Sequence, residues 1–241
     1  MDFEPEDVRF ADREDAGRAL AERLAHHAGR DDVVVLGLPR GGVPVAAQVA
    51  AGLHAPLDVL LVRKLGVPGR EELAMGAIAS GGIVELDEDT VKQWGITRTQ
   101  VKHVLERETA ELERRASAYR HGREMPSVRG RTVIVVDDGL ATGATMRAAV
   151  SALRKLGPAS IVVAVPVGSN EACDEMRRHA DECVCVRTPH PFFAVGAWYH
   201  DFTPTTDEEV TMWLERFRAV GDGGPDSLKH DSRSASGGAA P

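Results

Sequence analysis

The chain has 241 residues, of which 43% are hydrophobic and 27% charged, a balance typical of a globular protein with one good core. Its formal net charge of −8 argues against a protein whose main task is to grip nucleic acid. No basic, apolar leader opens the sequence, and no apolar run approaches the length of a membrane span, so we expect a cytoplasmic protein without a membrane partner. Cys173, Cys183 and Cys185 lack partners at metal-ligand spacing and are expected to be reduced thiols.

Helical and strand patterns alternate along the chain. In chain order, the spacing of apolar residues predicts a helix at 14–28, a strand at 33–36, a helix at 43–51, a strand at 57–62, a short antiparallel excursion at Ile78 and 83–86, a long helix at 98–121, a strand at 133–136, a helix ending at Leu156, a strand at 161–165, a helix near 171–179, a strand at 183–186 and a final helix around Val210–Phe217. This alternation predicts an α/β fold with a doubly wound, largely parallel sheet. From Gly221 onward the chain is rich in Gly, Ser and Asp, so we expect one domain over residues 1–220 and a disordered tail over 221–241.

The most informative stretch runs from Val133 to Thr145 and reads VIVVDDGLATGAT. Its four β-branched residues predict a strand buried on both faces, and a helix follows the loop. At such a junction, exposed N–H groups and the positive helix N-terminus favour a phosphate. The carboxylates of Asp137 and Asp138 would repel a phosphate, so they suit ribose hydroxyls or a hydrated Mg²⁺ beside it.

This stretch resembles the phosphoribosyl pyrophosphate (PRPP) binding motif of the type I phosphoribosyltransferases. The resemblance implies the type I fold with a small hood region, and it implies that Asp137 and Asp138 hold the ribose hydroxyls and Mg²⁺, the metal through water or the ribose. It also implies that the loop binds the 5′-phosphate through Gly139, Leu140, Ala141, Thr142, Gly143, Ala144 and Thr145. A Walker-type loop would need a lysine, and none occurs between residues 103 and 154.

Two further segments match the family's pattern. The first strand runs into Pro39, Arg40, Gly41 and Gly42, whose charge and backbone N–H groups suit an anion, and the resemblance implies that they bind the pyrophosphate.

The second strand ends at Arg63 and Lys64, and the resemblance implies that these cations touch the pyrophosphate. It also implies that the following segment, Val67 to Gly76, is a flexible catalytic loop that excludes water. Glu71 and Glu72 in this loop are weaker catalytic candidates, because a solvated charged loop explains them equally well.

The group that takes a proton from the acceptor is left open. Ala141 stands where the hypoxanthine-type enzymes of the family carry their general base, an Asp. The adenine-type enzymes also have Ala at this position and are thought to use a Glu of the flexible loop. Glu71 and Glu72 are therefore the candidates for this role, without an alignment that chooses between them.

Five of the eleven Phe, Trp and Tyr residues gather between Pro191 and Phe202. A planar base stacks on aromatic rings, so Phe192, Phe193 and Trp198 are candidates for binding the acceptor. The segment is loosely similar to the Phe-x-Val-Gly hood segment of the hypoxanthine-type enzymes. A hydrophobic cluster under the final helix is an equally good interpretation of any one of these aromatics.

The resemblance thus predicts an enzyme that transfers the 5-phosphoribosyl group from PRPP to a nitrogenous base, with Mg²⁺ as cofactor and release of pyrophosphate. It also implies a homodimer. The alternative is a regulator that senses PRPP or a nucleotide without catalysis, which Ala141 favours modestly. The acidic net charge and the lack of an appended DNA-binding domain argue against that alternative.

Overall fold

A five-stranded parallel sheet forms the centre of the computed structural model, which describes residues 9–222. Each pair of neighbouring strands is parallel. The strands lie in the order β2 (Leu57–Val59), β1 (Val33–Gly37), β6 (Thr132–Val136), β7 (Ser160–Val167) and β8 (Glu182–Arg187). Every residue of β1 and β6 is buried, as the continuous Val, Ile and Leu runs predict for strands covered on both faces.

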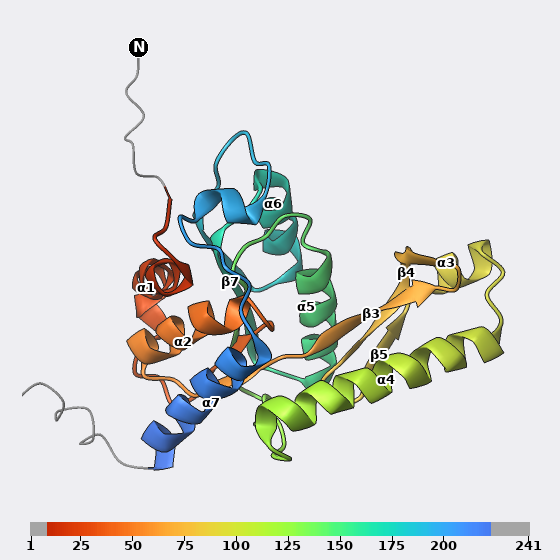
Figure 1. Cartoon of the computed structure of the whole chain (residues 1–241), viewed down its shortest axis with the longest axis horizontal. Helices are drawn as coiled ribbons and strands as arrows, with labels where there is room; N and C mark the ends of the chain where they lie inside the picture. The colour runs from red at the N-terminus through yellow and green to blue at the C-terminus, as the bar shows by residue number, and fades with distance from the viewer. Residues whose placement is uncertain (1–8, 223–241) are drawn as a thin grey trace, which may run out of the picture.

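Helices cover both faces of this sheet (Figure 1). Val33 and Val35 of β1 belong to a core shared with α1 (Arg13–Arg23), α2 (Gly42–Leu53) and α7 (Asp207–Asp222). Val34 and Leu36 point to the opposite core, which is shared with α5 (Ala144–Leu156) and α6 (Asn170–His179). Successive residues of one strand therefore enter two cores, and the predicted doubly wound α/β fold is confirmed.

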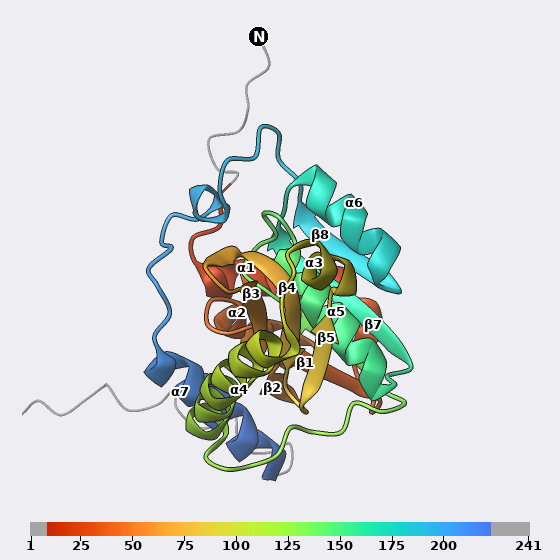
Figure 2. The same cartoon turned by 90° about the vertical axis from the view of Figure 1, so that its right-hand side faces the viewer.

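A second, antiparallel sheet projects from the first and contains β3 (Val62–Val67), β4 (Arg70–Ala79) and β5 (Ile83–Leu86). The short helix α3 (Glu88–Gln93) and the long α4 (Arg98–Arg120) follow it. We call residues 62–120 the arm, which Figure 1 shows extending away from the central sheet and Figure 2 shows in front of it. A buried ion pair of 3.0 Å between Arg120 Nε and Asp58 Oδ1 ties the end of α4 to β2.

Two sequence predictions for this region are wrong. The strand expected at 57–62 is divided, because β2 ends at Val59 and the chain passes into the second sheet at Val62. The segment from Val67 to Gly76, expected to be a flexible loop, instead forms a hairpin in which β3 pairs with β4. Gly69, with a φ of 77°, takes the turn position that a residue with a side chain rarely adopts.

The C-terminal helix α7 continues to Asp222, two residues beyond the expected end of the domain at residue 220. The rest of the expected tail, residues 223–241, lies outside the described residues, as do residues 1–8. Between residues 9 and 222, no helix is both long enough and apolar enough to cross a bilayer.

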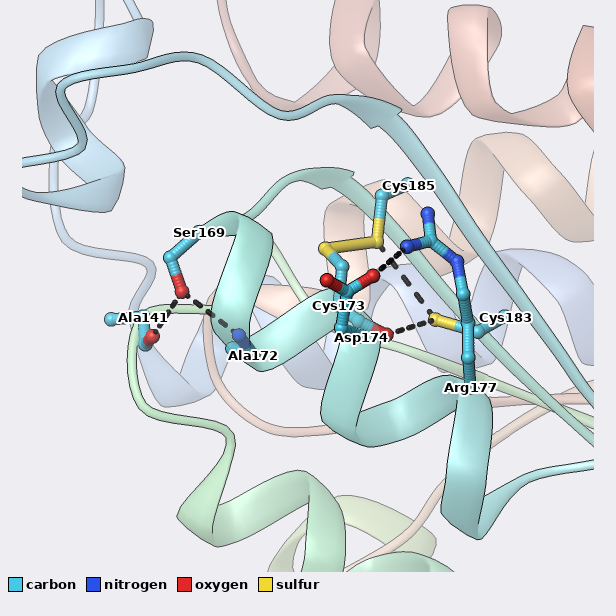
Figure 3. Close-up of a disulfide and its surroundings, with 8 residues drawn as sticks. All are labelled: Ala141, Ser169, Ala172, Cys173, Asp174, Arg177, Cys183 and Cys185. Carbon is cyan, nitrogen blue, oxygen red and sulfur yellow. Dashed lines mark hydrogen bonds and ion pairs between the residues drawn. A yellow bond between two sulfur atoms is a disulfide. The ribbon is translucent and has the colours of Figure 1, made fainter.

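The cysteines differ from the expectation of three reduced thiols. Cys173 of α6 and Cys185 of β8 form a disulfide (Figure 3). The 12-residue separation of this pair shows no pattern in the sequence, because the contact arises only when α6 packs on β8. Cys183 keeps a free thiol 3.9 Å from the sulfur of Cys185, and burial raises the pKa of that thiol.

Candidate functional site

Asp137 and Asp138 lie directly after β6, at the carboxyl end of the parallel sheet. The chain leaves β1 toward β2 on one side, whereas β6 leads to β7 on the other, so the strand order reverses between β1 and β6. Loops that leave two such strands diverge and open a crevice where α/β proteins bind ligands. Gly37 of β1 pairs with Val136 of β6, and the two predicted anion loops therefore begin side by side.

The segment Pro39–Gly42 packs tightly against the acid pair. A Cβ atom on Gly41 would lie 1.9 Å from Asp138 Oδ2, and one on Gly42 would lie 2.7 Å from the carbonyl oxygen of Val136. Both positions therefore require glycine. Arg40 is exposed at this loop, and the peptide bond that joins it to Pro39 is cis.

Hydrogen bonds hold the backbone of loop 139–145 to the neighbouring segment 167–169, and several residues of the loop are exposed to solvent. The amide of Leu140 donates to the carbonyl of Val167 at 2.9 Å, and the Ser169 hydroxyl donates to the carbonyl of Ala141 at 2.9 Å (Figure 3). Gly143, with a φ of 73°, is the N-cap of α5 and supplies no side chain to the helix terminus. The exposed Thr142 and Thr145 flank this terminus, which has the geometry of an anion site.

Arg13 of α1 is a site residue that the sequence reasoning missed. Its guanidinium Nε and Nη2 both lie 2.9 Å from Asp138 Oδ2, and the two side chains are only 11% and 17% exposed. Its Nη1 donates to the carbonyl of Thr203, and the guanidinium lies 4.0 Å above the ring of Phe202. Because 125 residues separate Arg13 from Asp138, nothing local in the sequence marks this contact.

The electrostatics of the acid pair favour a bound cation. Burial raises the pKa of Asp137, and the neighbouring charge of Asp138 raises it further. Burial also raises the pKa of Asp138, although Arg13 opposes this shift. One guanidinium thus faces two carboxylates, which leaves a negative charge when both are ionised, and a cation beside them would offset that charge.

Arg63 and Lys64, the predicted cations of the second strand, are successive residues of β3 and make different contacts, although both border one open cavity. Arg63 lines a small cavity of about 30 Å³ together with Pro39 and Thr145, so the structure brings Arg63 to the two anion loops. Its Nε also donates to Glu108 of α4 at 2.6 Å.

Lys64, Glu71 and Glu72 lie further along the arm. Lys64 Nζ donates to the backbone carbonyl of Glu72 at 2.9 Å, while the Glu72 side chain is fully exposed. The Glu71 carboxylate accepts a bond from the amide of Gly69. None of these bonds connects the three residues to the acid pair, and an open cavity of about 330 Å³ borders Lys64 and Glu71 instead.

The aromatic residues of segment 191–202 belong to, or pack against, a small core beside Asp138. Phe192 and Trp198 pack against a small core that contains Phe10 and Tyr199, whereas Phe193 is 84% exposed. The Trp198 indole N–H is buried without a hydrogen-bond partner among the described residues.

Val195 lies between Phe193 and Trp198 in residues 191–202, which we call the hood segment, and it contacts the predicted phosphate loop 139–145. A Cβ atom on Gly139 would lie 2.3 Å from its Cγ1. Tyr199 anchors the same segment by donating its hydroxyl to the carbonyl of Asp138 at 2.6 Å. The hood segment therefore lies over the acid pair and the loop, and Val195 is a second site residue that the sequence reasoning missed.

The family model described as the phosphoribosyl transferase domain matches residues 10–201. The chain belongs to the phosphoribosyltransferase family. The match includes Arg13, the acid pair, both predicted anion loops and Tyr199, and it ends just before Phe202 and Thr203.

The relatives of this family member match different shares of the chain. Two proteins from strains of Mycobacterium tuberculosis, each named "Putative phosphoribosyl transferase", are 50% identical over 207 residues, which is 86% of this chain and 46% of each relative. The chain thus spans about half the length of these curated relatives. The "Bifunctional protein PyrR" of Roseiflexus sp. is 30% identical over 164 residues, which is 65% of this chain and 69% of that protein.

A solved structure has the same architecture over nearly its whole length. The crystal structure of TT1426 from Thermus thermophilus matches with a TM-score of 0.78 and 45% identity, covering 87% of this chain and 99% of that chain. The chain is therefore similar in overall fold to a solved protein over most of its length.

Proposed function

We propose that the protein transfers the 5-phosphoribosyl group of PRPP to a nitrogenous base and releases pyrophosphate. The observation that supports this best is the position of Asp137 and Asp138 at the reversal of strand order, with a glycine-containing anion loop on either side. A donor with a sugar between two phosphate groups has the chemistry that such an arrangement accommodates.

In this proposal, Asp137 and Asp138 accept hydrogen bonds from the ribose hydroxyls, residues 139–145 bind the 5′-phosphate, and Pro39–Gly42 bind the pyrophosphate. The carboxylate oxygens are the hard ligands that Mg²⁺ prefers, and Arg13 is the one cation paired with them within residues 9–222. The residues present therefore fit Mg²⁺. When bound, Mg²⁺ would neutralise charge on the departing pyrophosphate.

Displacement at the ribose C1 develops positive charge on the sugar and negative charge on the leaving group, so the site must hold the anion and exclude water. We assign the pyrophosphate contact to Arg40 and Arg63, since Arg63 shares a cavity with Pro39 and Thr145. Lys64, Glu71 and Glu72 act in this scheme only if the hairpin of the arm closes toward the acid pair.

The proposed acceptor is a planar nitrogenous base held by the hood segment, with Phe192, Phe193 and Trp198 as candidates for the contact. The exposed ring of Phe193 and the unpaired indole N–H of Trp198 support this assignment. A homodimer is part of the proposal by resemblance, and light scattering coupled to gel filtration tests it.

A pyrophosphate-release screen tests the transfer reaction. Purines, pyrimidines and other nitrogen acceptors are each mixed with PRPP, Mg²⁺ and the protein. At least one acceptor should give pyrophosphate, and the double variant Asp137→Asn, Asp138→Asn should lose turnover while keeping its circular dichroism spectrum. Asp89→Asn, an exposed change at the start of α3, is the matched control and should keep full activity.

The second candidate is a sensor that binds PRPP without transferring it. Ala141 supports it, because no acid occupies that loop position and the carboxylates of Glu71 and Glu72 lie on the arm. Calorimetry separates the two functions: PRPP binding that requires Mg²⁺ and Asp137, together with failure of every acceptor, supports the sensor. Full turnover in the double Asn variant would overturn both the sensor and the role assigned to Asp137 and Asp138 in transfer.

A further inference from the structure

Two histidines and a glutamate meet at the end of the sheet opposite the acid pair. His26 and His27 belong to η1 (Ala25–His27), the 3-10 turn that follows α1, and Glu182 is the first residue of β8. Strand β8 begins here and runs toward the ligand-binding edge, so the PRPP site does not involve these three residues.

The three side chains already face one another. His26 Nε2 lies 3.0 and 3.4 Å from the two carboxylate oxygens of Glu182, and His27 Nε2 lies 2.9 Å from Glu182 Oε2. The His27 side chain is only 7% exposed, whereas that of His26 is 55% exposed. One ligand is thus held inside the protein, and the other leaves a path for entry from solvent.

Two imidazoles and one carboxylate form a donor set that suits a borderline transition metal better than Mg²⁺ or Ca²⁺. Zn²⁺ bonds to such atoms have lengths of about 2.0–2.2 Å, which places neighbouring ligand atoms of a tetrahedral site roughly 3.3–3.5 Å apart. The separations of 2.9–3.4 Å approach these values, so a small outward movement of the side chains makes room for the ion.

The 3-10 turn that carries both histidines is fixed, because the amide of His27 donates to the carbonyl of Leu24 at 2.8 Å. Glu182 offers two carboxylate oxygens, and each of them lies within 3.0 Å of a histidine Nε2.

We propose that His26, His27 and Glu182 bind a Zn²⁺ ion that joins the N-terminal helix to the edge strand β8, with the fourth coordination position open to water. The three ligands come from two elements that pack together, so the ion links segments 155 residues apart in the chain. Helix α1 presents Arg13 to Asp138 at its other end, and the metal therefore stabilises the helix that completes the PRPP site.

Arg30 limits the affinity of this site. Its Nη1 lies 3.3 Å from His27 Nδ1, and a neutral ring that accepts this bond carries its proton on Nε2. Metal binding at Nε2 moves the proton to Nδ1, so the contact with Arg30 must open. Arg30 keeps two bonds to Asp32 at 3.0 and 2.7 Å, and this pairing holds the guanidinium in place when the contact opens.

The test is Zn²⁺ titration of the full chain, freed of metal and without PRPP or Mg²⁺, by calorimetry and by thermal melting. One equivalent should bind and raise Tm as its concentration rises. Co²⁺ should bind at the same stoichiometry and give the visible absorption of a four-coordinate ion with nitrogen ligands. His26→Gln and Glu182→Gln should each weaken Zn²⁺ binding at least about tenfold, the smallest loss expected even for supporting groups around a metal.

Three further variants make the result specific. His103→Gln removes an exposed histidine of α4, and Cys183→Ser removes the neighbouring free thiol, so both should bind Zn²⁺ as the wild type does. Arg30→Gln should bind Zn²⁺ more tightly, because it removes a positive charge and the donor at His27 Nδ1. Equal binding by wild type and the double variant His26→Gln, Glu182→Gln, or the absence of any Zn²⁺-dependent change in Tm, overturns the proposal.

Discussion

At the scale of single residues, the acid pair that we propose for ligand binding lowers the stability of the fold when it is ionised. A group whose folded-state pKa is raised destabilises the fold when it ionises, and this cost grows as the pH rises through the raised pKa. Asp137 is such a group, since both burial and Asp138 raise its pKa. Ionised Asp137 therefore lowers the free energy of unfolding, and a ligand that interacts with its carboxylate would offset this loss.

Asp137→Asn should consequently raise the free energy of unfolding at neutral pH by about 0.5–2 kcal/mol, as other substitutions that relieve an unfavourable site do. The amide oxygen can still accept the bond that the Asp138 amide donates at 2.9 Å. Urea unfolding at neutral and mildly acidic pH measures the effect, and the difference should shrink as the pH falls through the raised pKa toward the ordinary value of 3.8. The same variant should lose Mg²⁺-dependent PRPP binding, whereas a variant that binds PRPP normally would contradict the assigned role.

Arg13→Gln should act in the opposite direction. It leaves the Asp138 carboxylate without its cation at a site where both side chains are at least four-fifths buried, and we expect a loss of about 2–3 kcal/mol. Arg18→Gln on the same helix is the matched control, because its pair with Asp15 is exposed and contributes at most about 1 kcal/mol. Adding Asp138→Asn to Arg13→Gln should restore most of the stability, and an unchanged loss would show that Arg13 acts mainly through Phe202.

At the scale of elements, the hood segment packs closely against the predicted phosphate loop 139–145, where Val195 lies beside Gly139. Gly139→Ala would place a methyl group 2.3 Å from Val195 Cγ1, so either the loop or the hood segment must move. We expect a loss of about 1–3 kcal/mol, the usual range for overpacking, together with weaker PRPP binding. Val195→Ala in the same chain should recover both, and a double-mutant cycle in unfolding and calorimetry measures that coupling. Additive effects of the two substitutions would argue against direct contact.

The link between α6 and β8 gives a second prediction at this scale. Cys185→Ser should lower the free energy of unfolding by about 2–4 kcal/mol under non-reducing conditions, because it opens a short covalent loop. Cys183→Ser keeps the disulfide and should change stability far less. Unfolding with and without a reductant compares the two, and a wild type insensitive to the reductant would show that the pair is reduced in solution.

The elements that the sequence predicts well are those with a local signal. The strands at 33–36 and 133–136 are continuous apolar runs, and each leads into a glycine-containing loop and a helix, so both junctions are visible in the sequence. Arg13, Val195 and the disulfide escape prediction because each depends on a contact between distant segments. The hairpin of the arm is not predicted for another reason. The charged residues at 70–72 and the glycines at 66, 69 and 76 interrupt the alternation of apolar and polar residues that would indicate strands.

At the scale of the whole molecule, the protein divides into a buried parallel sheet and an arm whose β4 begins with exposed residues. Amide exchange should therefore be slowest in β1 and β6, where every residue is buried, and faster in the first half of β4, because local opening requires little loss of apolar contact there. Addition of PRPP with Mg²⁺ should slow exchange at 39–42 and 139–145, the two loops that meet at the acid pair. Slower exchange at 70–72 as well would show that the arm closes over the ligand and would bring Glu71 and Glu72 into consideration as the general base. Protection confined to the two loops, with Lys64 and its neighbours unchanged, would instead leave the arm outside the reaction and strengthen the sensor.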